Sequence, residues 1–270
     1  MIISEIKMGL GNQLFQYAAG FSLSRYQNVP FVLDVSSYEI DYRREFCLKY
    51  FEINDIKTEI ETDSDEDVYF DYYVEPHFSF DNSFFTKKDF TYLSGYWQSG
   101  RYFEMFEKDI CERFLVKRQY IEHLNLDKLG FNNCQSVSLH IRRTDYIIFT
   151  FMEVLSLTYY YKAIESLKHR YNNLRFYIFS DDMDWVKQNF DTKGLDCIFV
   201  SRICTKNHLE DFYLMQQCKH HIIANSTFSW WTAWLSRYSD KQVIAPAKWF
   251  SNQACGKLND LIPQGWLVID

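Results

Sequence analysis

Three features are scarce in this sequence: long apolar runs, closely spaced cysteines and excess positive charge. No stretch approaches the 18 or so apolar residues of a membrane-spanning helix, and the first residues lack the basic and apolar regions of a signal peptide. The seven cysteines are scattered without metal-ligand spacing, which is typical of free thiols in a reducing compartment. We therefore expect a cytoplasmic protein without a transmembrane segment. Peripheral contact with a membrane stays open.

The charge and the aromatic content narrow the class of partner. The net charge of −7 argues against a general nucleic-acid binder, which needs a basic surface. Aromatic residues make up 19% of the chain, so that some are expected to stack on planar ligands or sugar rings, although an aromatic-rich core explains the same figure. The 270 residues fit one large domain or two of about 130 residues each.

The first 35 residues predict a strand, a loop, a helix and a second strand. The strands are expected at residues 2–6 and 31–35, parallel to each other, with a helix from about Asn12 to Tyr26 between them. Gly9 and Gly11 resemble part of a dinucleotide-binding fingerprint, but Leu14 occupies the third glycine position. The fingerprint is therefore incomplete.

The glycine-rich turn still predicts a site for an anion at the start of the helix. Backbone N–H groups at a helix N-terminus favour an anion or a developing negative charge, and the Asn12 and Gln13 side chains add hydrogen-bonding groups there. The alternative is that Asn12 serves only as the N-cap of the helix.

The second half alternates between strand and helix patterns, which predicts a parallel, doubly wound sheet. The first half is harder to interpret, and we divide the chain into Rossmann-like halves at residues 1–130 and 131–270, with a cleft between them. In the second half we expect strands at 137–141, 175–179, 197–200, 221–224 and 242–245. The helices of the second half are expected at 158–170, 182–190, 209–218 and 228–235. In the first half we expect strands at 68–74 and 92–98, a helix at 101–114 and a linker at 124–133.

Four polar residues lie at or just past the end of the predicted strand at 137–141: His140, Arg142, Arg143 and Asp145. Ligands bind at the carboxyl ends of strands in an open α/β sheet. Two adjacent arginines suit a pyrophosphate, because a guanidinium donates in a bidentate geometry that lysine lacks. The alternative is an ion pair of one arginine with Asp145 that only holds the loop.

A second polar group follows the predicted strand at 221–224. Where that strand ends and a helix begins, the sequence has five consecutive residues of interest: Asn225, Ser226, Thr227, Phe228 and Ser229. Three hydroxyls and the N–H groups of the first helical turn are expected to converge as a cradle for phosphate oxygens. An ordinary N-cap needs only one of these hydroxyls, so we favour ligand contact.

Two acidic motifs remain. Asp182 and Asp184 match the Asp-x-Asp of metal-dependent transferases, but acids in a first helical turn are also the expected start of a helix. We expect no metal, because the arginine pair already offers positive charge. Asp211 is a candidate partner for guanine, since a carboxylate can accept two parallel hydrogen bonds from the N1–H and the exocyclic amine of that base.

Together these stretches resemble the α1,2-fucosyltransferases of glycosyltransferase family 11. The likeness covers nearly the whole chain in the right order. It implies a GT-B-type fold without a metal cofactor, and inverting transfer of L-fucose from GDP-β-L-fucose to the 2-hydroxyl of a galactose-containing oligosaccharide or lipid-linked glycan. The matching segments are 9–17, 140–145, 179–182 and 225–231.

The resemblance also suggests roles for the candidate residues. Arg142, with Ser226 and Thr227, would stabilise the charge that grows on the departing GDP. Asn12, in the loop that contains Gly11, would face the fucose, and Asp145 matches the family motif without a settled role. We assign His140 to the nucleoside, Asp211 to guanine and Arg143 to a contact with Asp145; no general base stands out.

Two alternatives stay open. One is a GT-B transferase of another nucleotide sugar, which would share the pyrophosphate cradle. The other is a non-catalytic glycan-binding protein, which would bind sugar independently of GDP.

Overall fold

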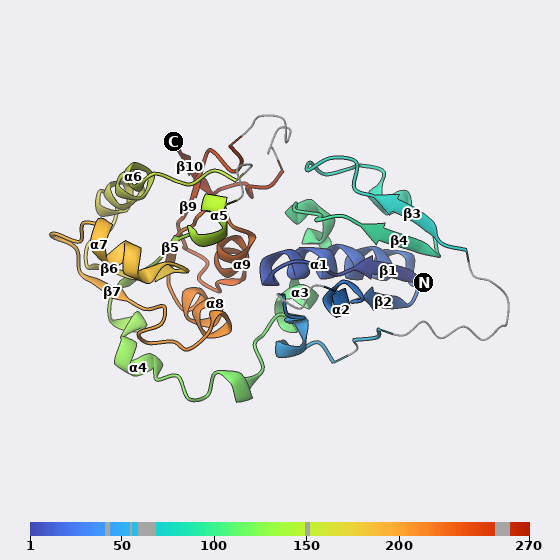
Figure 1. Cartoon of the computed structure of the whole chain (residues 1–270), viewed down its shortest axis with the longest axis horizontal. Helices are drawn as coiled ribbons and strands as arrows, with labels where there is room; N and C mark the ends of the chain where they lie inside the picture. Colours follow the sequence, from blue (N-terminus) through green and yellow to red (C-terminus); the bar gives the residue numbers. More distant parts are fainter. Residues whose placement is uncertain (41–43, 55, 59–68, 149–151, 252–259) are drawn as a thin grey trace. The chain divides into compact units, whose positions relative to one another are not determined.

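The structure is a computed structural model that describes residues 1–40, 44–54, 56–58, 69–148, 152–251 and 260–270 (Figure 1). The chain divides into two compact units. Unit 1 comprises Met1–Lys117 and Cys255–Pro263, and unit 2 comprises Arg118–Ala254 and Gln264–Asp270. The resemblance implies an acceptor role for residues 1–130 and a nucleotide-sugar-binding role for residues 131–270, and both stay predictions.

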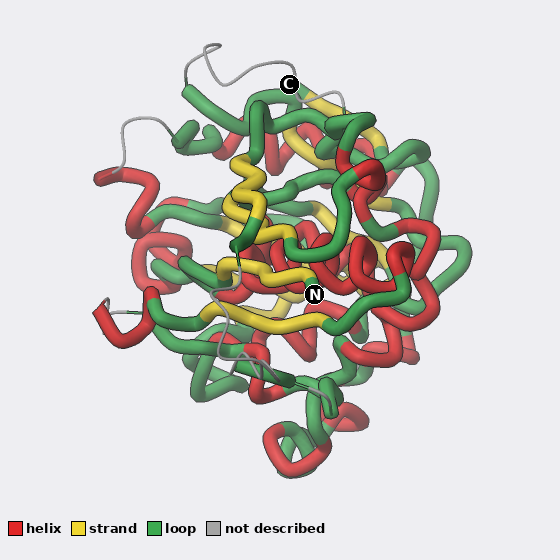
Figure 2. The backbone as a smooth tube through the Cα atoms, turned by 90° about the vertical axis from the view of Figure 1, so that its right-hand side faces the viewer, coloured by secondary structure: helices red, strands yellow, loops and turns green. Residues whose placement is uncertain are grey.

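Unit 1 contains a parallel four-stranded sheet in the order β2-β1-β4-β3. Its strands lie side by side near the N-terminus in Figure 2. The helix α1, which spans Leu10–Gln27, follows β1 and leads to β2, as predicted. The strands are β1 (Ile2–Glu5), β2 (Phe31–Asp34), β3 (Asp71–Val74) and β4 (Thr91–Ser94).

The contact of α1 with its sheet depends on a glycine that the fingerprint did not locate. A Cβ on Gly20 would lie 2.5 Å from the ring of Phe31 and 2.8 Å from Cβ of Ser4, so the helix can approach the strands only without a side chain there. The Ser4 hydroxyl also donates to the carbonyl of Gln16 at 2.9 Å. The packing glycine of this unit is thus at position 20.

The helix α1 begins two residues earlier than predicted. Gly9 is the N-cap, in extended conformation, and its carbonyl accepts from the N–H groups of Asn12 and Gln13 at 3.0 and 3.1 Å. The alternative that Asn12 is the N-cap is therefore wrong. Asn12 lies inside the first turn, and its side chain is available for other contacts.

Unit 2 contains a parallel six-stranded sheet in the order β10-β9-β8-β5-β6-β7. The order reverses between β5 and β8, as in doubly wound folds whose ligands bind at that point. The predicted α/β class with parallel Rossmann-like sheets is confirmed. The strands are β5 (Gln135–Ile141), β6 (Leu174–Ser180), β7 (Cys197–Phe199), β8 (His220–Ile222), β9 (Val243–Pro246) and β10 (Leu267–Ile269).

Helices cover both faces of this sheet, so its central strands are buried on both sides. Val137, Leu139 and Ile141 of β5 belong to one core cluster, whereas Tyr177 and Phe179 of β6 belong to a second cluster on the other face. This explains the nearly continuous apolar character of the central strands. The main helices are α6 (Leu157–Lys168), α7 (Met183–Asn189), α8 (His208–Gln216) and α9 (Thr227–Leu235).

Several short elements were not predicted. The strand expected at 92–98 ends at Ser94, and the turn that follows contains Trp97, whose φ of 55° lies outside the β region. The stretch expected as one helix at 101–114 consists of two 3₁₀ turns followed by α3. The remaining short helices are α2 (Ser37–Ile40), α3 (Glu107–Arg113), α4 (Leu126–Leu129) and α5 (Thr144–Ile148), with 3₁₀ turns at Leu48–Tyr50, Phe84–Thr86, Gly100–Tyr102, Glu104–Phe106, Arg118–Tyr120 and Phe131–Asn133.

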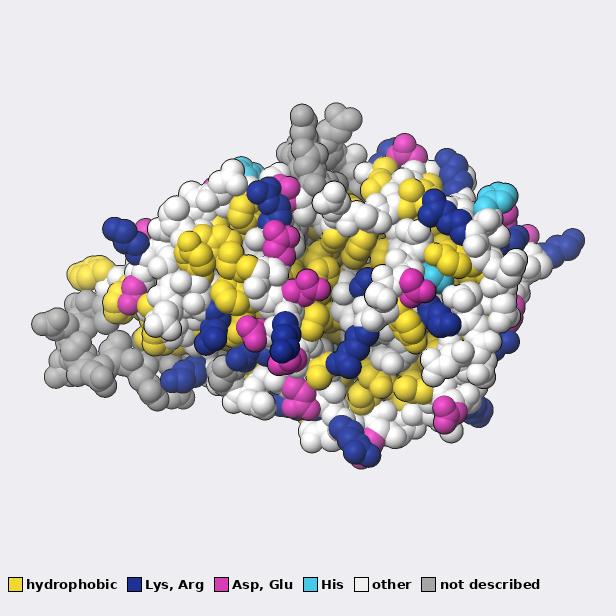
Figure 3. Space-filling model, turned by 180° about the vertical axis from the view of Figure 1, so that it is seen from behind, with side chains coloured by type: hydrophobic (Ala, Val, Ile, Leu, Met, Phe, Trp, Pro, Cys, Tyr) yellow, Lys and Arg dark blue, Asp and Glu magenta, His cyan; other side chains and the backbone are white. Residues whose placement is uncertain are grey.

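The surface and the thiols agree with the composition. On the face drawn in Figure 3, basic and acidic side chains are interspersed with apolar ones. None of the six cysteines in the described ranges forms a disulfide bond. Among the described residues, no helix is both long and apolar enough to cross a membrane.

Candidate functional site

The candidate site of unit 2 lies where three parallel strands end at one edge of the sheet. Ile141, the last residue of β5, pairs with Ser180, the last residue of β6. Leu139 of β5 pairs with Ile222, the last residue of β8. The segments that follow these strands therefore emerge together, at the point where the strand order reverses, which is the ligand-binding position of such sheets.

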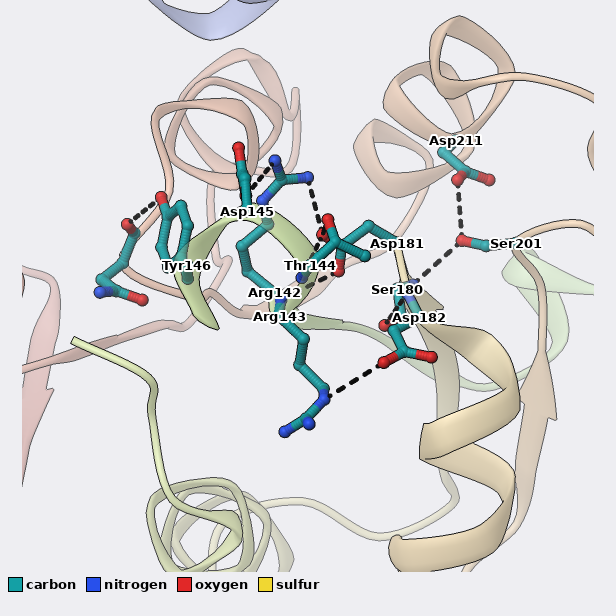
Figure 4. A network of polar contacts seen from close by, with 11 residues as sticks. Arg142, Arg143, Thr144, Asp145, Tyr146, Ser180, Asp181, Asp182, Ser201 and Asp211 are labelled. Atoms are coloured by element: carbon teal, nitrogen blue, oxygen red, sulfur yellow. Dashed lines mark hydrogen bonds and ion pairs between the residues drawn. The ribbon is translucent and has the colours of Figure 1, made fainter. Parts of the chain in front are cut away.

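Arg142 is held by two carboxylates from different segments (Figure 4). Its Nη2 lies 2.7 Å from Oδ1 of Asp145, and its Nη1 lies 3.1 Å from Oδ2 of Asp181. The guanidinium also stands over the ring of Tyr146, 5.5 Å from the ring centre. The side chain keeps 24% of its surface exposed, so the guanidinium is fixed in direction while part of it can meet a ligand.

Asp181 organises the turn after β5. It accepts hydrogen bonds from the N–H groups of Arg143 and Thr144, at 2.9 and 3.0 Å, and from the Thr144 hydroxyl. Burial alone would raise the pKa of Asp181, but the charge of Arg142 and the bonds from Thr144 outweigh it and hold the pKa below its usual range. No role was predicted for this residue from the sequence. The signal was its position directly after β6, opposite Arg142.

Arg143 has other partners than the sequence suggested. Its Nε lies 3.5 Å from Oδ2 of Asp182, and its guanidinium lies 3.3 Å from the centre of the Trp185 ring. The expectation that Arg143 holds Asp145 is corrected, since Arg142 makes that contact. Arg142 and Arg143 point to opposite sides in Figure 4, as consecutive residues of an extended segment do.

Asp182 serves as the N-cap of α7. Its Oδ1 accepts from the N–H of Trp185 at 3.2 Å, while its Oδ2 contacts Arg143. Asp184 lies in the first turn of the same helix. These contacts fit the alternative that the two acids mark the start of a helix. Both oxygens of Asp182 already have partners.

Tyr146 joins the turn after β5 to the turn after β8. Its hydroxyl donates to the carbonyl of Asn225 at 2.8 Å and also hydrogen-bonds the side chain of Ser226. Burial raises the pKa of Tyr146, so the phenol stays protonated and can donate. Arg142 and Ser226, which lie 84 positions apart in the sequence, therefore both contact Tyr146, one over its ring and the other at its hydroxyl.

The start of α9 lacks a side-chain cap. Ser226 is the N-cap residue in extended conformation, but its side chain does not bond the first N–H groups of the helix. Thr227 and Phe228 are partly exposed. A helix N-terminus with unsatisfied amides favours an anion, both through those N–H groups and through the helix dipole.

Two residues of the same turn have structural partners. The amide nitrogen of Asn225, a residue that is 1% exposed, donates to the carbonyls of Glu153 and Trp249 at 2.8 and 2.7 Å. The buried Ser229 hydroxyl donates to the carbonyl of Ser226 at 3.2 Å. Asn225 and Ser229 thus shape the turn, and Ser226 and Thr227 are left as the hydroxyls for which ligand contact is predicted.

His140 and Asp211 are the residues assigned to the nucleoside. His140 is buried, with its ring centre 5.7 Å from that of Phe228, and burial and the nearby Arg142 charge lower its pKa to about 4. The imidazole is therefore neutral at pH 7, and its Nδ1 has no hydrogen-bond partner among the described residues. It is a buried polar atom that a ligand can satisfy.

Asp211 lies in the first turn of α8 and contacts two hydroxyls. It accepts from Ser201 at 2.7 Å and from Thr205 at 2.6 Å, and the Ser201 oxygen accepts from the N–H of Ser180 at 3.1 Å. Burial raises the pKa of Asp211 to about 6, although the two hydroxyl bonds act in the opposite direction. Asp211 is mostly ionised at pH 7 and connected to the end of β6 (Figure 4).

In unit 1, Asn12 and Gln13 in the first turn of α1 have different contacts. The Asn12 oxygen accepts from Nε2 of Gln98 at 3.0 Å, which leaves its amide nitrogen as a donor. The buried Gln13 donates to the carbonyls of Met8 and Glu45 and accepts from the N–H of Cys47. Gln13 therefore stabilises the turn through backbone contacts, whereas Asn12 is available to a ligand.

Comparison with known proteins identifies similar sequences over the whole chain. A family model described as "Glycosyl transferase family 11" matches residues 2–270. An alpha-1,2-colitosyltransferase of Escherichia coli is 30% identical, covering 100% of this chain and 99% of that protein. The O-antigen biosynthesis glycosyltransferase WbnK of Escherichia coli is 32% identical, over 93% of this chain and 95% of that protein.

A mammalian relative and solved structures extend the comparison. The galactoside alpha-(1,2)-fucosyltransferase 2 of Pongo pygmaeus is 27% identical over 55% of this chain and 46% of its own length. The fucosyltransferase NodZ of Bradyrhizobium covers 86% of this chain and 91% of its own, with a TM-score of 0.55 and 16% identity. A mutant of Arabidopsis thaliana FUT1 in complex with GDP covers 100% and 76%, with a TM-score of 0.55 and 10% identity. These structures show a shared GT-B-like fold.

Proposed function

The chain belongs to glycosyl transferase family 11, and from that premise we propose that it is an inverting transferase that moves L-fucose from GDP-β-L-fucose to the 2-hydroxyl of a galactoside. The observation that carries the proposal is the fixed guanidinium of Arg142, joined through Tyr146 to the uncapped start of α9. A relative matched over its full length and named as an alpha-1,2-colitosyltransferase supports the linkage.

The reaction places negative charge on the departing GDP as the bond from fucose to phosphate breaks. Arg142, the first N–H groups of α9 and the hydroxyls of Ser226 and Thr227 supply donors for that charge. Donors that are already oriented before the reaction stabilise the transition state without reorganisation. Asp145 and Asp181 provide that orientation, since each holds one nitrogen of Arg142.

The nucleoside would contact the same edge of the sheet. The neutral imidazole of His140 can donate from one nitrogen and accept with the other. Each Asp211 oxygen already accepts one hydroxyl, from Ser201 or Thr205, and would accept from guanine with its second lone pair. Arg143, stacked on Trp185 and paired with Asp182, would hold the turn that carries Asp181. Its role in this proposal is positioning.

Unit 1 would contribute the turn that contains Gly11 and Asn12, whose free amide nitrogen would donate to the sugar at the reacting centre. The acceptor would be a galactose-ended oligosaccharide or a lipid-linked glycan. A general base remains unassigned, and a highly dissociative displacement needs little help from one. A cytoplasmic location stays a prediction from the cysteine pattern.

We further propose that transfer needs no metal ion. The Arg142 guanidinium and the N–H groups at the start of α9 would supply the positive charge that a cation would otherwise bring to the diphosphate. Both oxygens of Asp182 are engaged, one by Arg143 and one by the N–H of Trp185. No cofactor besides the donor substrate is required by this chemistry.

A second donor is a specific candidate. Colitose is the 3-deoxy form of L-fucose, and the full-length relative from Escherichia coli is named for transfer of that sugar. The diphosphate and guanine contacts proposed above would serve either donor. Discrimination would therefore depend on contacts with the 3-hydroxyl of the sugar.

The proposal is tested by incubating the purified protein with GDP-fucose, EDTA and a panel of galactose-ended acceptors. We expect mass spectrometry to detect acceptors that have gained one fucose, and linkage analysis to place it on the 2-hydroxyl of galactose. Parallel reactions contain GDP-colitose or UDP-sugars.

Each other outcome contradicts a named part of the proposal. Turnover of GDP-colitose alone would assign the 3-deoxy donor, and turnover of a UDP-sugar would contradict the guanine contacts. Glycan binding that is indifferent to GDP, without any product, would indicate a non-catalytic protein. Turnover abolished by EDTA and restored by Mn²⁺ would support a metal at Asp182 and Asp184.

A further inference from the structure

Two turns of unit 1 have an unfavourable backbone conformation at neighbouring strands. Met8, after β1, has a φ of 69°, and Trp97, after β4, has a φ of 55°. The strands β1 and β4 pair directly, so both turns leave the same edge of the sheet. Bulky residues adopt positive φ only where their surroundings impose it, and such positions cluster at functional sites.

The conformation after β4 is imposed by Glu75, which follows β3. One carboxylate oxygen of Glu75 accepts from the N–H of Tyr96 at 2.6 Å, and the other accepts from the N–H of Trp97 at 3.0 Å. A Cβ on Gly95 would lie 2.9 Å from Oε2 of Glu75 and still closer to its Cβ. The turn is thus built around this one carboxylate, and residue 95 must be glycine for the carboxylate to fit.

The same turn positions Asn12. Gln98, the residue after Trp97, donates to the Asn12 oxygen at 3.0 Å. A second connection runs through the buried Gln16, whose oxygen accepts from the N–H of Lys7 at 2.9 Å and whose amide nitrogen donates to the carbonyl of Gly95 at 3.1 Å. The turn after β4 and the start of α1 are therefore coupled at two points.

We propose that Glu75 is a positioning residue for glycosyl transfer. By fixing the turn at 95–97 it sets the direction of Gln98, and Gln98 in turn occupies the Asn12 oxygen, so that only the Asn12 amide nitrogen faces the reacting sugar. Nothing in the family motifs assigns a role to Glu75, Gly95 or Gln98. The inference rests on the proposed function, because it takes Asn12 to be a substrate contact.

The test is a double-mutant cycle with Glu75→Gln and Asn12→Ala. A glutamine at 75 offers one acceptor to two N–H groups and turns its own NH₂ toward the other, so the turn loses its shape with little change in volume. We expect Glu75→Gln to lower kcat about tenfold to a hundredfold, the scale for misplacing a positioned group. In the Asn12→Ala background the same change should cost less than about twofold, because the residue that it positions is gone.

Asp89→Asn is the matched control, since Asp89 accepts from a backbone N–H of the same unit, that of Phe90 at 2.9 Å, at the opposite end of β4. It should have the same small effect in both backgrounds. Equal losses from Glu75→Gln in both backgrounds, or a wild-type rate for that variant, would overturn the inference. A wild-type rate for Asn12→Ala would remove the substrate role of Asn12 and the inference with it.

A second measurement does not depend on turnover. Hydrogen exchange should accelerate in Glu75→Gln at both residues 95–98 and residues 10–13, and at neither segment in Asp89→Asn. Acceleration confined to 95–98 would overturn the coupling to Asn12. Failure of the proposed function itself is recognised separately, because the wild-type protein would then give no product from any GDP-sugar.

Discussion

Replacing Arg142 with alanine is expected to lower kcat/KM at least about a hundredfold, the scale for losing one donor that stabilises developing charge. The variant removes a side chain that Asp145 and Asp181 both hold. Arg142→Lys keeps the charge but lacks the bidentate geometry, so it should recover only part of the loss. The measurement is steady-state transfer from GDP-fucose, with circular dichroism to confirm the fold.

Arg175→Ala is the matched control for this prediction. Arg175, at the start of β6, pairs with Asp196 through Nε at 2.9 and 3.0 Å, in the same unit but at the opposite end of the strand. This exposed pair contributes little to stability, and its loss should leave transfer unchanged. Turnover of Arg142→Ala within a few-fold of wild type would contradict the assignment of Arg142 to the diphosphate.

Replacing Asp181 with asparagine is expected to affect both stability and transfer. The carboxylate accepts from two backbone N–H groups, a hydroxyl and Arg142. Removing one partner of a fully buried ion pair costs about 3 kcal/mol or more, so for this partly buried pair we expect a loss of about 2 kcal/mol. Because Arg142 loses one of its two anchors, transfer should fall by about a hundredfold. Urea unfolding at pH 7 and steady-state kinetics measure the two effects.

The pH dependence of this loss has a defined sign. The pKa of Asp181 is held below its usual range in the folded protein, so its stabilising contribution is complete above the ordinary carboxyl pKa and disappears as the pH falls through the folded value. The stability difference between wild type and Asp181→Asn should therefore shrink below about pH 4. A difference that stays constant or grows on acidification would contradict the ion pair, and Asp196→Asn serves as the exposed control.

The sequence was sufficient for the elements with strong periodicity. Val137, Leu139 and Ile141 predicted a buried strand, and the polar residues that follow it predicted the edge where the turns of β5 and β8 meet. Alternation of strand and helix then implied parallel pairing, and the register brings Tyr146 to Asn225. The order of the elements along the chain and the rules for parallel sheets were sufficient for these predictions.

The partners of charged groups could not be predicted in the same way. Which arginine meets Asp145 depends on side-chain direction at the end of β5, and the role of Asp181 depends on the register of β5 with β6. The need for glycine at position 20 of α1 has no sequence signature, because it comes from the close approach of Phe31 on β2. Glu75 likewise acquires its partners only when β3 pairs with β4. These features arise from contacts between segments, which local patterns do not encode.

The most direct measurement is a crystal structure of the protein with bound GDP. We expect the β-phosphate oxygens to lie within hydrogen-bond distance of the Arg142 guanidinium and of the backbone N–H groups at 227–229, with guanine near His140 and Asp211. A diphosphate bound away from both Arg142 and the start of α9 would contradict the central claim.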